Sequence, residues 1–404
     1  MERAMNSAVS GLRSHQLMLD VTGNNIANVN TTGYKVGRTT FADVLSQTLA
    51  GATATGPTVG GTNPQQVGLG VRVGAITNIF TQGGILTTTK GTDLAIQGDG
   101  FYVLNDGSAN FYTRAGAFEV DSAGYLVDAV TGYKVQGDSG DIVIPTTVTS
   151  PAAATANATF TGNLDSATAA GGTYTSPITI YDSLGGTHTL TLTFTKTATP
   201  GEFTYATTES DASMTIAGGG TGTIQFGGGG SITAGGTGTV TLNFTNGATS
   251  PQTATFDFAS AGNLAPVTGY ASPSTLSLLA QDGNTSGALQ SFTIGSDGTI
   301  NGTFSNGRIL TLATIRLATF SNPAGLTKLG NNLYRESANS GLANIGNPGT
   351  GNRGTLVPGA LEGSNVDLAE EFTRLIVAQR GFQANARVIT TSDEILQEAV
   401  NLKR

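Results

Sequence analysis

Apolar residues recur at alternating steps of four and three through the last part of the chain. This spacing places them on one side of a helix, in the pattern of a coiled-coil seam. Charged residues such as Glu370, Arg374 and Arg387 fall between the seam positions, and Asp393 interrupts the seam itself. The pattern predicts a long amphipathic helix. Its seam residues are Leu368, Phe372, Leu375, Gln379, Phe382, Ala386, Ile389, Leu396 and Val400.

The beginning of the chain repeats this spacing over a shorter length. The series predicts a second amphipathic helix, which ends near residues 24–30, where Asn residues and then Gly33 provide helix-ending chemistry. Nothing apolar lies next to either helix in sequence to cover its stripe. The seam residues of this helix are Met5, Val9, Leu12, Gln16 and Leu19.

The interior of the chain has the pattern of strands joined by glycine turns. Residues 101–104 and 111–113 flank an Asp-Gly turn, which indicates a β-hairpin, and residues 118–120 and 125–127 flank a second turn. Further on, residues 187–195 alternate between Thr and mostly apolar side chains. Thr favours a pleated strand because its side chain is branched at Cβ. We therefore expect antiparallel β-structure, with a sandwich or barrel in the central block.

Proline and charge divide the chain into regions. All twelve Pro lie between Pro57 and Pro358, so both predicted helices are free of it. The block from Pro145 to Asn284 carries seven acidic residues against Lys196 alone. Two stretches rich in Gly, Thr and Asn, residues 51–64 and 339–354, are predicted linkers.

These divisions predict a mainly β chain with terminal α-helices, built from nested, discontinuous domains. Residues 1–30 with 362–404 are expected to form a coiled-coil-like helical core domain, and residues 31–70 with 355–361 a connecting segment. Residues 71–144 with 285–354 are expected to form an inner antiparallel β domain, and residues 145–284 an outer one.

Composition excludes several classes of function. The 404 residues contain no Cys and only two His, which excludes thiolate chemistry and leaves little for a histidine metal site. A net charge of −8 argues against a nucleic-acid surface. No apolar stretch is long enough to predict a membrane span, and the first residues lack the pattern of a cleavable signal peptide.

No catalytic, cofactor or metal site emerges from the motifs. There is no nucleophile elbow and no phosphate-binding glycine loop. His15 and His188 are both expected to be solvent-exposed. We therefore predict a protein that is not an enzyme and holds no cofactor.

The two helical seams have two interpretations. In one, they form the core of a helical hairpin within a single chain. In the other, they pack against further copies of the same chain. The second is favoured because the long β-type interior supplies no helical layer to cover the seams. Polar seam residues such as Gln16 and Gln379 also resemble those that specify register between partners.

Both ends of the chain also resemble a known family. Residues 20–35, DVTGNNIANVNTTGYK, and residues 365–372 and 379–387 are similar to the terminal motifs of the bacterial flagellar axial proteins, which include rod, hook and hook-associated proteins. Residues 98–103 and 112–116 resemble the inner β domain of that family. The N-terminal motif residues that match are Asn24, Asn25, Ala27, Asn28, Thr32, Gly33 and Tyr34.

The resemblance implies a structural subunit that polymerises with itself into a curved, hollow tube, a universal joint that transmits torque from the rod to the filament. The large central block favours the hook members over the shorter distal rod proteins and over the hook-associated proteins. Implied partners are further copies of the chain, the distal rod, the hook cap, the hook–filament junction protein and the flagellar export apparatus. The implied location is the hook on the basal body, outside the cell, after export without a cleavable signal peptide.

Two other classes of function stay open on the residues alone. A monomeric secreted or surface protein could bind a carbohydrate or a receptor through the Thr-rich sandwich, although such a module would not need the end helices. An enzyme ranks third, because no residues can be nominated for catalysis.

Overall fold

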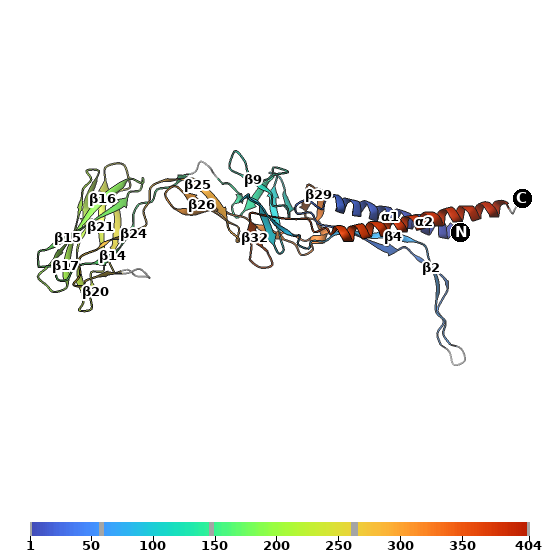
Figure 1. The fold of residues 1–404 in the computed structure, drawn as a ribbon, viewed down its shortest axis with the longest axis horizontal. Helices are drawn as coiled ribbons and strands as arrows, with labels where there is room; N and C mark the ends of the chain where they lie inside the picture. Colours follow the sequence, from blue (N-terminus) through green and yellow to red (C-terminus); the bar gives the residue numbers. More distant parts are fainter. Residues whose placement is uncertain (1, 56–59, 145–148, 260–265, 402–404) are drawn as a thin grey trace. The chain divides into compact units, whose positions relative to one another are not determined.

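Helices at the two ends and strands through the interior confirm the predicted fold class (Figure 1). The computed structural model describes residues 2–55, 60–144, 149–259 and 266–401. The chain divides into two compact units. The first unit comprises Met1–Pro145, Thr293–Asn301 and Thr311–Arg404, and the second comprises Thr146–Phe292 and Gly302–Leu310.

The two helices, α1 (Glu2–Ala27) and α2 (Leu368–Asn401), pack together in opposite directions (Figure 1). Asn25 of α1 is bonded to Glu371 of α2, whereas Gly11 lies against Asn385. As the residue number decreases along α1, the residue number of the facing position on α2 increases, so the two helices are antiparallel. Carried to Glu2, this offset brings the start of α1 opposite residue 394. The last turns of α2 thus extend beyond α1.

The start of α2 is capped by its own sequence. Asp367 accepts hydrogen bonds through Oδ1 from the backbone N–H groups of Ala369, at 2.8 Å, and Glu370, at 3.3 Å. Glu370 and Glu371 add negative charge to the first turn, where the helix dipole favours it. The helix therefore begins where the sequence predicts.

Two antiparallel ribbons follow α1. Strand β1 (Gly37–Asp43) pairs with β4 (Val71–Asn78), and β2 (Ser46–Ala50) pairs with β3 (Gln65–Gly68). The Val71 backbone N–H donates to the Ser10 hydroxyl at 3.2 Å, which attaches β4 to α1. Thr53 and Thr62 form a β-bridge, so the ends of the predicted linker 51–64 continue a hairpin instead. Its residues 56–59 lie outside the described residues.

A ten-stranded sheet forms the body of the first unit, and it contains both predicted hairpins as β7–β8 and β9–β10. A core of aromatic side chains, including Phe101, Tyr112 and Tyr334, packs with it. Its strands are β7 (Phe101–Asn105), β8 (Asn110–Thr113), β9 (Phe118–Val120), β10 (Leu126–Asp128), β11 (Lys134–Gly137), β12 (Gly140–Asp141), β28 (Leu317–Thr319), β29 (Thr327–Gly330), β30 (Leu333–Arg335) and β31 (Asn344–Gly346).

The second predicted linker, residues 339–354, is part of this folded unit. Strand β31 pairs with β28, and Ser340 is buried with its hydroxyl donating to the Ser337 carbonyl at 3.0 Å. The prediction was wrong because Gly and Asn supply turns within a sheet as readily as they supply a flexible linker. A short 3₁₀ turn, η1 (Pro323–Gly325), precedes this stretch.

Two short antiparallel strand pairs precede α2. Strand β33 (Ala360–Glu362) pairs with β5 (Ile85–Thr87), and β32 (Thr355–Pro358) pairs with β6 (Leu94–Gln97). A separate four-stranded sheet has the order β13-β25-β26-β27. Its strands are β13 (Thr149–Ser150), β25 (Gly287–Ile294), β26 (Thr299–Phe304) and β27 (Ile309–Thr314).

Two sheets pack face to face in the second unit and share one hydrophobic core, so this unit is a β-sandwich. The five-stranded sheet consists of β15 (Thr173–Tyr181), β16 (Thr187–Lys196), β17 (Glu202–Glu209), β19 (Thr221–Phe226) and β20 (Ile232–Ala234). The six-stranded sheet consists of β14 (Asn157–Asn163), β18 (Met214–Gly219), β21 (Thr237–Phe244), β22 (Gln252–Asp257), β23 (Val267–Thr268) and β24 (Ser277–Gln281).

The alternation of Thr and apolar residues in β16 directs Leu190, Leu192 and Phe194 into the core, as predicted. The pairing is not wholly antiparallel as predicted. Strand β14 pairs in parallel with β22 and β23. Nearly a hundred residues of sequence separate β14 from these two partners. The strands are therefore joined by a long connection and not by a hairpin turn, and a long connection permits parallel pairing.

Neither histidine is fully exposed, contrary to the prediction. His188 is buried, since it shares the inward face of β16 with Leu190. His15 is half-buried between α1 and its surroundings, with its ring against Gly381 and 5.5 Å from the ring of Phe41. In both cases the period of the element, and not the polarity of the residue, decides the direction of the side chain.

Candidate assembly surface

Asn25 joins the end of α1 to two other segments. Its Nδ2 donates to the Gly37 carbonyl at 2.8 Å and to Oε2 of Glu371 at 2.9 Å. Its Oδ1 accepts from the Gly37 N–H at 3.0 Å and from the Tyr34 hydroxyl at 3.1 Å. Asn25 is buried with all four bonds made. It therefore fixes α1, the start of β1 and α2 in one arrangement.

Neighbouring motif residues close the helix end. Asn28 donates through Nδ2 to the Asn24 carbonyl at 2.9 Å, and Thr31 donates to Asn28 Oδ1 at 3.0 Å. Asn24 donates to the Tyr34 hydroxyl at 3.3 Å, whereas Ala27 is exposed in the last turn. Burial raises the pKa of Tyr34, and Glu371 adds to this effect, so its hydroxyl stays protonated as a donor. These bonds satisfy groups that the helix end leaves free.

The motif continues through Thr32 and Gly33 into the inner β-structure. The Thr32 carbonyl accepts from Nδ2 of Asn332 at 2.8 Å, and the Gly33 N–H donates to the Glu362 carbonyl at 2.8 Å. Gly33 has a φ of 69°, and a Cβ there would lie 2.5 Å from the backbone nitrogen of Ala115. Only glycine fits both the angle and the space.

Gly33→Ala is expected to lower the free energy of unfolding of the monomer by about 2–4 kcal/mol. The left-handed φ costs about 1–2 kcal/mol, and the contact with Ala115 adds a cost of similar size. Gly23→Ala is the matched control, because nothing lies within 4 Å of that position in α1 and Ala favours a helix. Urea unfolding followed by circular dichroism measures both. Equal stabilities would contradict the expectation.

Glu362 lies at the centre of a buried ion group. Its Oε1 is 2.6 Å from Lys35 Nζ, and its Oε2 is 3.3 Å from Nη1 of Arg114, with all three side chains at most 2% exposed. Lys35 also donates to the Thr81 carbonyl at 2.8 Å. Burial lowers the pKa of Lys35, while Glu362 opposes the shift. The group links the chain near α1, the inner sheet and the approach to α2.

Asn365 holds the approach to α2 on the same side. Its Oδ1 accepts from the Val36 N–H at 2.8 Å, and its Nδ2 donates to the Ile79 carbonyl at 2.9 Å. Together with Asn25 and Glu362, it attaches both helices to the inner β-structure. The helices therefore leave a common, fixed base.

Within the chain, α2 meets α1 along one stripe. Three of its residues are buried and four are half-buried. The stripe shares Leu375, Phe382 and Ile389 with the predicted seam and lies one position before it elsewhere. The residues of this contact stripe are Glu371, Leu375, Ala378, Phe382, Asn385, Ile389 and Ser392.

The predicted seam residues outside this stripe stay accessible. On α2, Ala386 is half-buried, and Leu368, Phe372, Gln379, Leu396 and Val400 are exposed. On α1, the side chains buried in the chain are Ala8, Gly11, Ser14, Thr22 and Asn25. The seam of α1 flanks them, with Met5, Val9, Leu12 and Leu19 half-buried and Gln16 exposed.

The two seams lie on the same side of the helical pair. On α1, Val9 and Leu12 each follow a buried contact residue by one position, and Phe372 follows Glu371 in the same way on α2. One position is a rotation of about 100° in a fixed sense. In antiparallel helices, the same rotation leads to the same side. The seams therefore form one mainly apolar face, which we call the seam face; its apolar residues on α1 are half-buried, and those on α2 are half-buried or exposed.

More apolar side chains are exposed on α2 than the seam contains. Phe372 is 51% exposed and Val400 is 68% exposed. A monomeric soluble protein rarely exposes apolar side chains in a continuous row. The additional exposed residues are Ile376, Val377, Val388 and Ile395.

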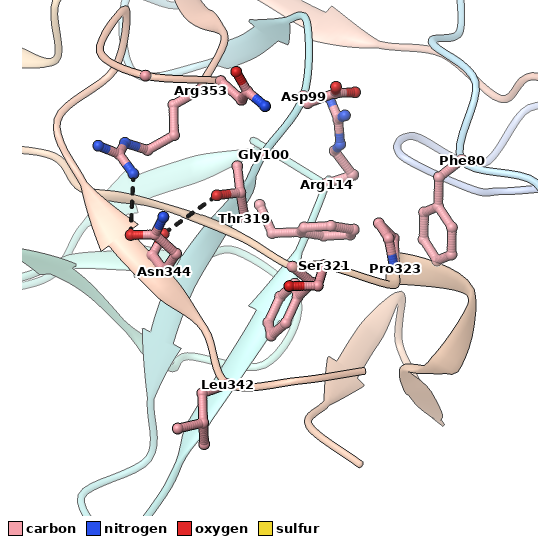
Figure 2. A pocket seen from close by; sticks show the side chains of 14 residues that line it. Phe80, Asp99, Gly100, Arg114, Thr319, Ser321, Pro323, Leu342, Asn344 and Arg353 are labelled. Carbon is pink, nitrogen blue, oxygen red and sulfur yellow. Dashed lines mark hydrogen bonds between the residues drawn. The ribbon is translucent and has the colours of Figure 1, made fainter. Parts of the chain in front are cut away.

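A pocket of about 470 Å³ opens in the first unit (Figure 2). Phe80, Phe101 and Phe320 line it, together with Asp99 and Arg114. Arg353 is held by Asn344 and by the loop that contains it. The lining of the pocket includes the hydroxyl side chains of Ser321 and Thr319 but no His or Lys beside them.

The described residues also contain no cluster of three or more His, Asp or Glu side chains suited to a metal ion. Over the same residues, neither helix has the length and apolar character needed to cross a membrane.

Comparison with known proteins identifies the family at both ends and in the interior. Residues 5–35 match "Flagella basal body rod protein" and residues 95–157 match "Flagellar hook protein FlgE/F/G D1 domain". Residues 144–284 match "Flagellar basal body protein FlaE D2 domain", and residues 357–402 match "Flagellar basal body rod FlgEFG protein C-terminal".

Relatives match over the whole chain. "Flagellar hook protein FlgE" of Borreliella burgdorferi is 39% identical over 441 residues, and that of Treponema pallidum is 37% identical over 463 residues, each covering 100% of both chains. "Flagellar basal-body rod protein FlgG" of Bacillus subtilis is 35% identical over 405 residues with the same coverage. The chain therefore belongs to the family of flagellar hook and rod proteins, which is structural and not enzymatic.

Within that family the chain groups with the hook subunits. The full-length hook relatives and the FlaE D2 match both point to them. Membership implies polymerisation with further copies of itself along the flagellar axis.

The buried ion group is what the sequence analysis missed. Lys35 lies in the matched N-terminal motif and Arg114 in the matched inner segment, but neither was assigned a partner. Only 11% of the residues are charged, and Lys35 is the only cation of that motif, which is a signal of burial with an anion.

Proposed function

We propose that the seam face joins copies of this hook subunit into a curved, hollow tube that transmits torque from the rod to the filament. The observation that carries the proposal is the accessible apolar row on α2. Burying one such side chain contributes about 1.5–3 kcal/mol. The proposed contact residues are those of the two seams.

The β2–β3 ribbon is a second proposed contact. Residues 44–71 contain no charged side chain, and Leu45, Leu49 and Val67 are exposed. An isolated two-stranded ribbon is only marginally stable in water. We propose that a neighbouring copy covers it in the polymer.

The proposed division of labour follows the nested domains of the sequence. Terminal helices held by Asn25, Glu362 and Asn365 give a stiff connection that resists twisting. The outer block, residues 145–284, presents Thr- and Gly-rich faces with few charges, which favour shallow contacts that reform during bending. Head-to-tail contacts that do not close on themselves generate an open helical lattice.

The proposed partners beyond further copies are the distal rod, the hook cap, the hook–filament junction protein and the flagellar export apparatus. The proposed location is the hook, outside the cell, after export without a cleavable signal peptide. Support for both comes from family membership. A distal rod or hook-associated role is the second candidate, favoured by the full-length rod relative.

Electron microscopy of the purified chain at high concentration tests the proposal. Curved hollow tubes are the expected result. Straight tubes would favour the rod alternative, and a protein that stays monomeric at every concentration would refute assembly through its own helices.

Deleting the outer block tests the division of labour. Replacing Pro145–Asn284 by a short Gly-Ser linker is expected to leave polymerisation intact and to change the curvature, because the seam face is untouched. The measurement compares the curvature of tubes from the shortened and full-length chains. Loss of polymerisation with intact circular dichroism would show that the outer block carries the assembly contacts.

A further inference from the structure

A second row of apolar side chains runs along α2 outside the seam. Val377 is 56% exposed, Val388 is 40% exposed and Ile395 is 52% exposed. Ala384, which lies between the two valines, is also exposed. The four residues follow one another at steps of seven, four and seven, which keeps their side chains on one side of the helix. We call this row, made of Val377, Ala384, Val388 and Ile395, the rear stripe.

The rear stripe lies on the side of the helical pair opposite the seam face. On α2, the seam residues Phe372 and Gln379 each follow a residue of the contact stripe by one position. By contrast, Val377, Ala384 and Val388 each precede one. One position in the opposite sense is a rotation of about 100° the other way. The stripe that packs on α1 therefore separates the two exposed rows of α2.

On α1 the rear side is covered within the chain. Ser10 and Val21 each precede a buried residue of α1 by one position, so they face the rear. The Ser10 hydroxyl accepts a hydrogen bond from the Val71 N–H of β4, and a Cβ added to Gly37 of β1 would lie 3.4 Å from Val21 Cγ1. The β1–β4 ribbon thus covers the rear of α1, whereas the rear stripe of α2 stays exposed.

The charged group at the beginning of the rear stripe is already paired. Arg374 lies just before Val377 on this side of α2, and its guanidinium is 2.6 Å from Glu370 and 3.2 Å from Glu371. A partner can therefore cover this end of the stripe without removing water from an unpaired charge. The four residues of the stripe itself are apolar.

An open polymer needs two different surfaces on each subunit. A face that pairs with the same face of another copy forms a closed dimer, whereas contact between two different faces continues from copy to copy. Membership of the hook and rod family implies polymerisation along the flagellar axis. The seam face is one surface on the helical pair, and the rear stripe is an apolar surface on its other side. This argues for a further copy of the chain as the occupant of the rear stripe.

We propose that the rear stripe receives the seam face of the next copy, so that each helical pair is held between two neighbours. The inference rests on the proposed function and adds the second face of the contact. The seam contributes the large side chains of Leu368 and Phe372, whereas the rear stripe has Ala384 between two valines. Large side chains of one row fit between the smaller ones of the other, as knobs fit into holes.

Cysteine labelling tests the rear stripe with little disturbance, because the chain has no Cys of its own. Ala384→Cys probes the rear stripe, Ala386→Cys probes the seam, and Thr373→Cys probes the polar side of α2. The reagent is a maleimide, which reacts with accessible thiols. In tubes, the thiols at positions 384 and 386 are expected to react at least about tenfold more slowly than in the monomer. The thiol at position 373 is expected to keep the monomer rate.

The outcomes of this experiment separate the inference from the proposed function. Slow labelling at position 386 with unchanged labelling at position 384 would overturn the rear stripe and leave the seam face supported. Unchanged labelling at position 386 would refute the seam face itself.

A photo-crosslinker identifies the surface that covers the rear stripe. Ala384→Cys carrying benzophenone maleimide is mixed as a minority into wild-type tubes and irradiated. The expected product is a crosslinked dimer in which the label has reacted with seam residues of the neighbouring chain. Dimers crosslinked only through other segments would overturn the pairing of the two faces.

Val388→Asp tests the same face through loss of assembly. Burying a carboxylate in the contact is expected to raise the critical concentration for polymerisation at least about tenfold, while circular dichroism shows a folded chain. Arg387→Gln is the control, because this adjacent residue is exposed and its substitution changes the net charge by the same one unit. Equal polymerisation of the two variants would also overturn the rear stripe.

Discussion

Phe372→Asp is expected to prevent polymer growth and leave the subunit folded. Phe372 is 51% exposed in the single chain, so an exposed substitution there costs the fold about 0.5 kcal/mol or less. In the proposed polymer the same position is buried. Losing the apolar contact of the exposed half of the side chain removes about 1–1.5 kcal/mol, and placing a carboxylate there adds a desolvation cost of about 2 kcal/mol or more. Since 1.4 kcal/mol corresponds to a tenfold change in a binding constant, the critical concentration for polymerisation should rise at least about 100-fold.

Thr373→Asp is the matched control for this change. The two residues are adjacent and exposed on the same helix, but Thr373 points away from the seam face. Sedimentation at increasing concentration measures the amount of polymer, and circular dichroism measures the fold. If Phe372→Asp polymerises as well as Thr373→Asp, the seam face is not the assembly surface.

Glu362→Gln is expected to lower the free energy of unfolding of the first unit by about 3–5 kcal/mol. The change keeps the shape of the side chain and removes the only anion between Lys35 and Arg114 in the buried group. Two cations would then share a site that water does not reach. Breaking a buried ion pair by removing one partner has a cost of this size.

Glu119→Gln supplies the comparison, because Glu119 pairs with Lys90 at 2.6 Å on the surface with both side chains about half exposed. Such pairs contribute about 0–1 kcal/mol. Chemical unfolding at fixed pH measures both variants. A loss for Glu362→Gln no larger than that for Glu119→Gln would show that the buried group is not held together by charge.

Periodicity explains why the helices and most strands could be predicted. Large apolar residues at steps of three and four, or at every second position, report which side of an element is covered. This spacing did not reveal which side of each helix packs against the other helix within the chain. The contact between α1 and α2 uses Gly11, Asn385 and Gly381, which are small or polar and give no hydrophobic signal. Leu375, Phe382 and Ile389 belong to both the seam and the contact stripe, whereas Phe372 lies one position away from the stripe.

Phe382 illustrates the difference between a seam and a contact. It belongs to the predicted seam and also to the stripe that packs α2 against α1. A charge at Phe382 would disturb the subunit as well as any contact between copies. Phe372 separates these effects, and only the structure distinguishes the two positions.

The position of His188 in the strand pattern indicates that it is buried, although a polar side chain is usually expected on the surface. The residue is in phase with Leu190 and Leu192, so period two directs it inward. Its hydrogen-bond partners, Asp182 and Asp211, come from turns, and their convergence depends on how the two sheets stack. Tertiary packing of this kind has no local pattern. The parallel pairing of β14 has the same cause.

The antiparallel arrangement of α1 and α2 has a practical consequence for labelling. Glu2 and Asn401, the outermost described residues of the helices, belong to the same end of the helical pair (Figure 1). A purification tag or fluorescent fusion on either terminus would thus crowd one location, next to the exposed Ile395 and Val400. A reporter inserted in the exposed turn between β7 and β8, at residues 106–109, avoids that crowding.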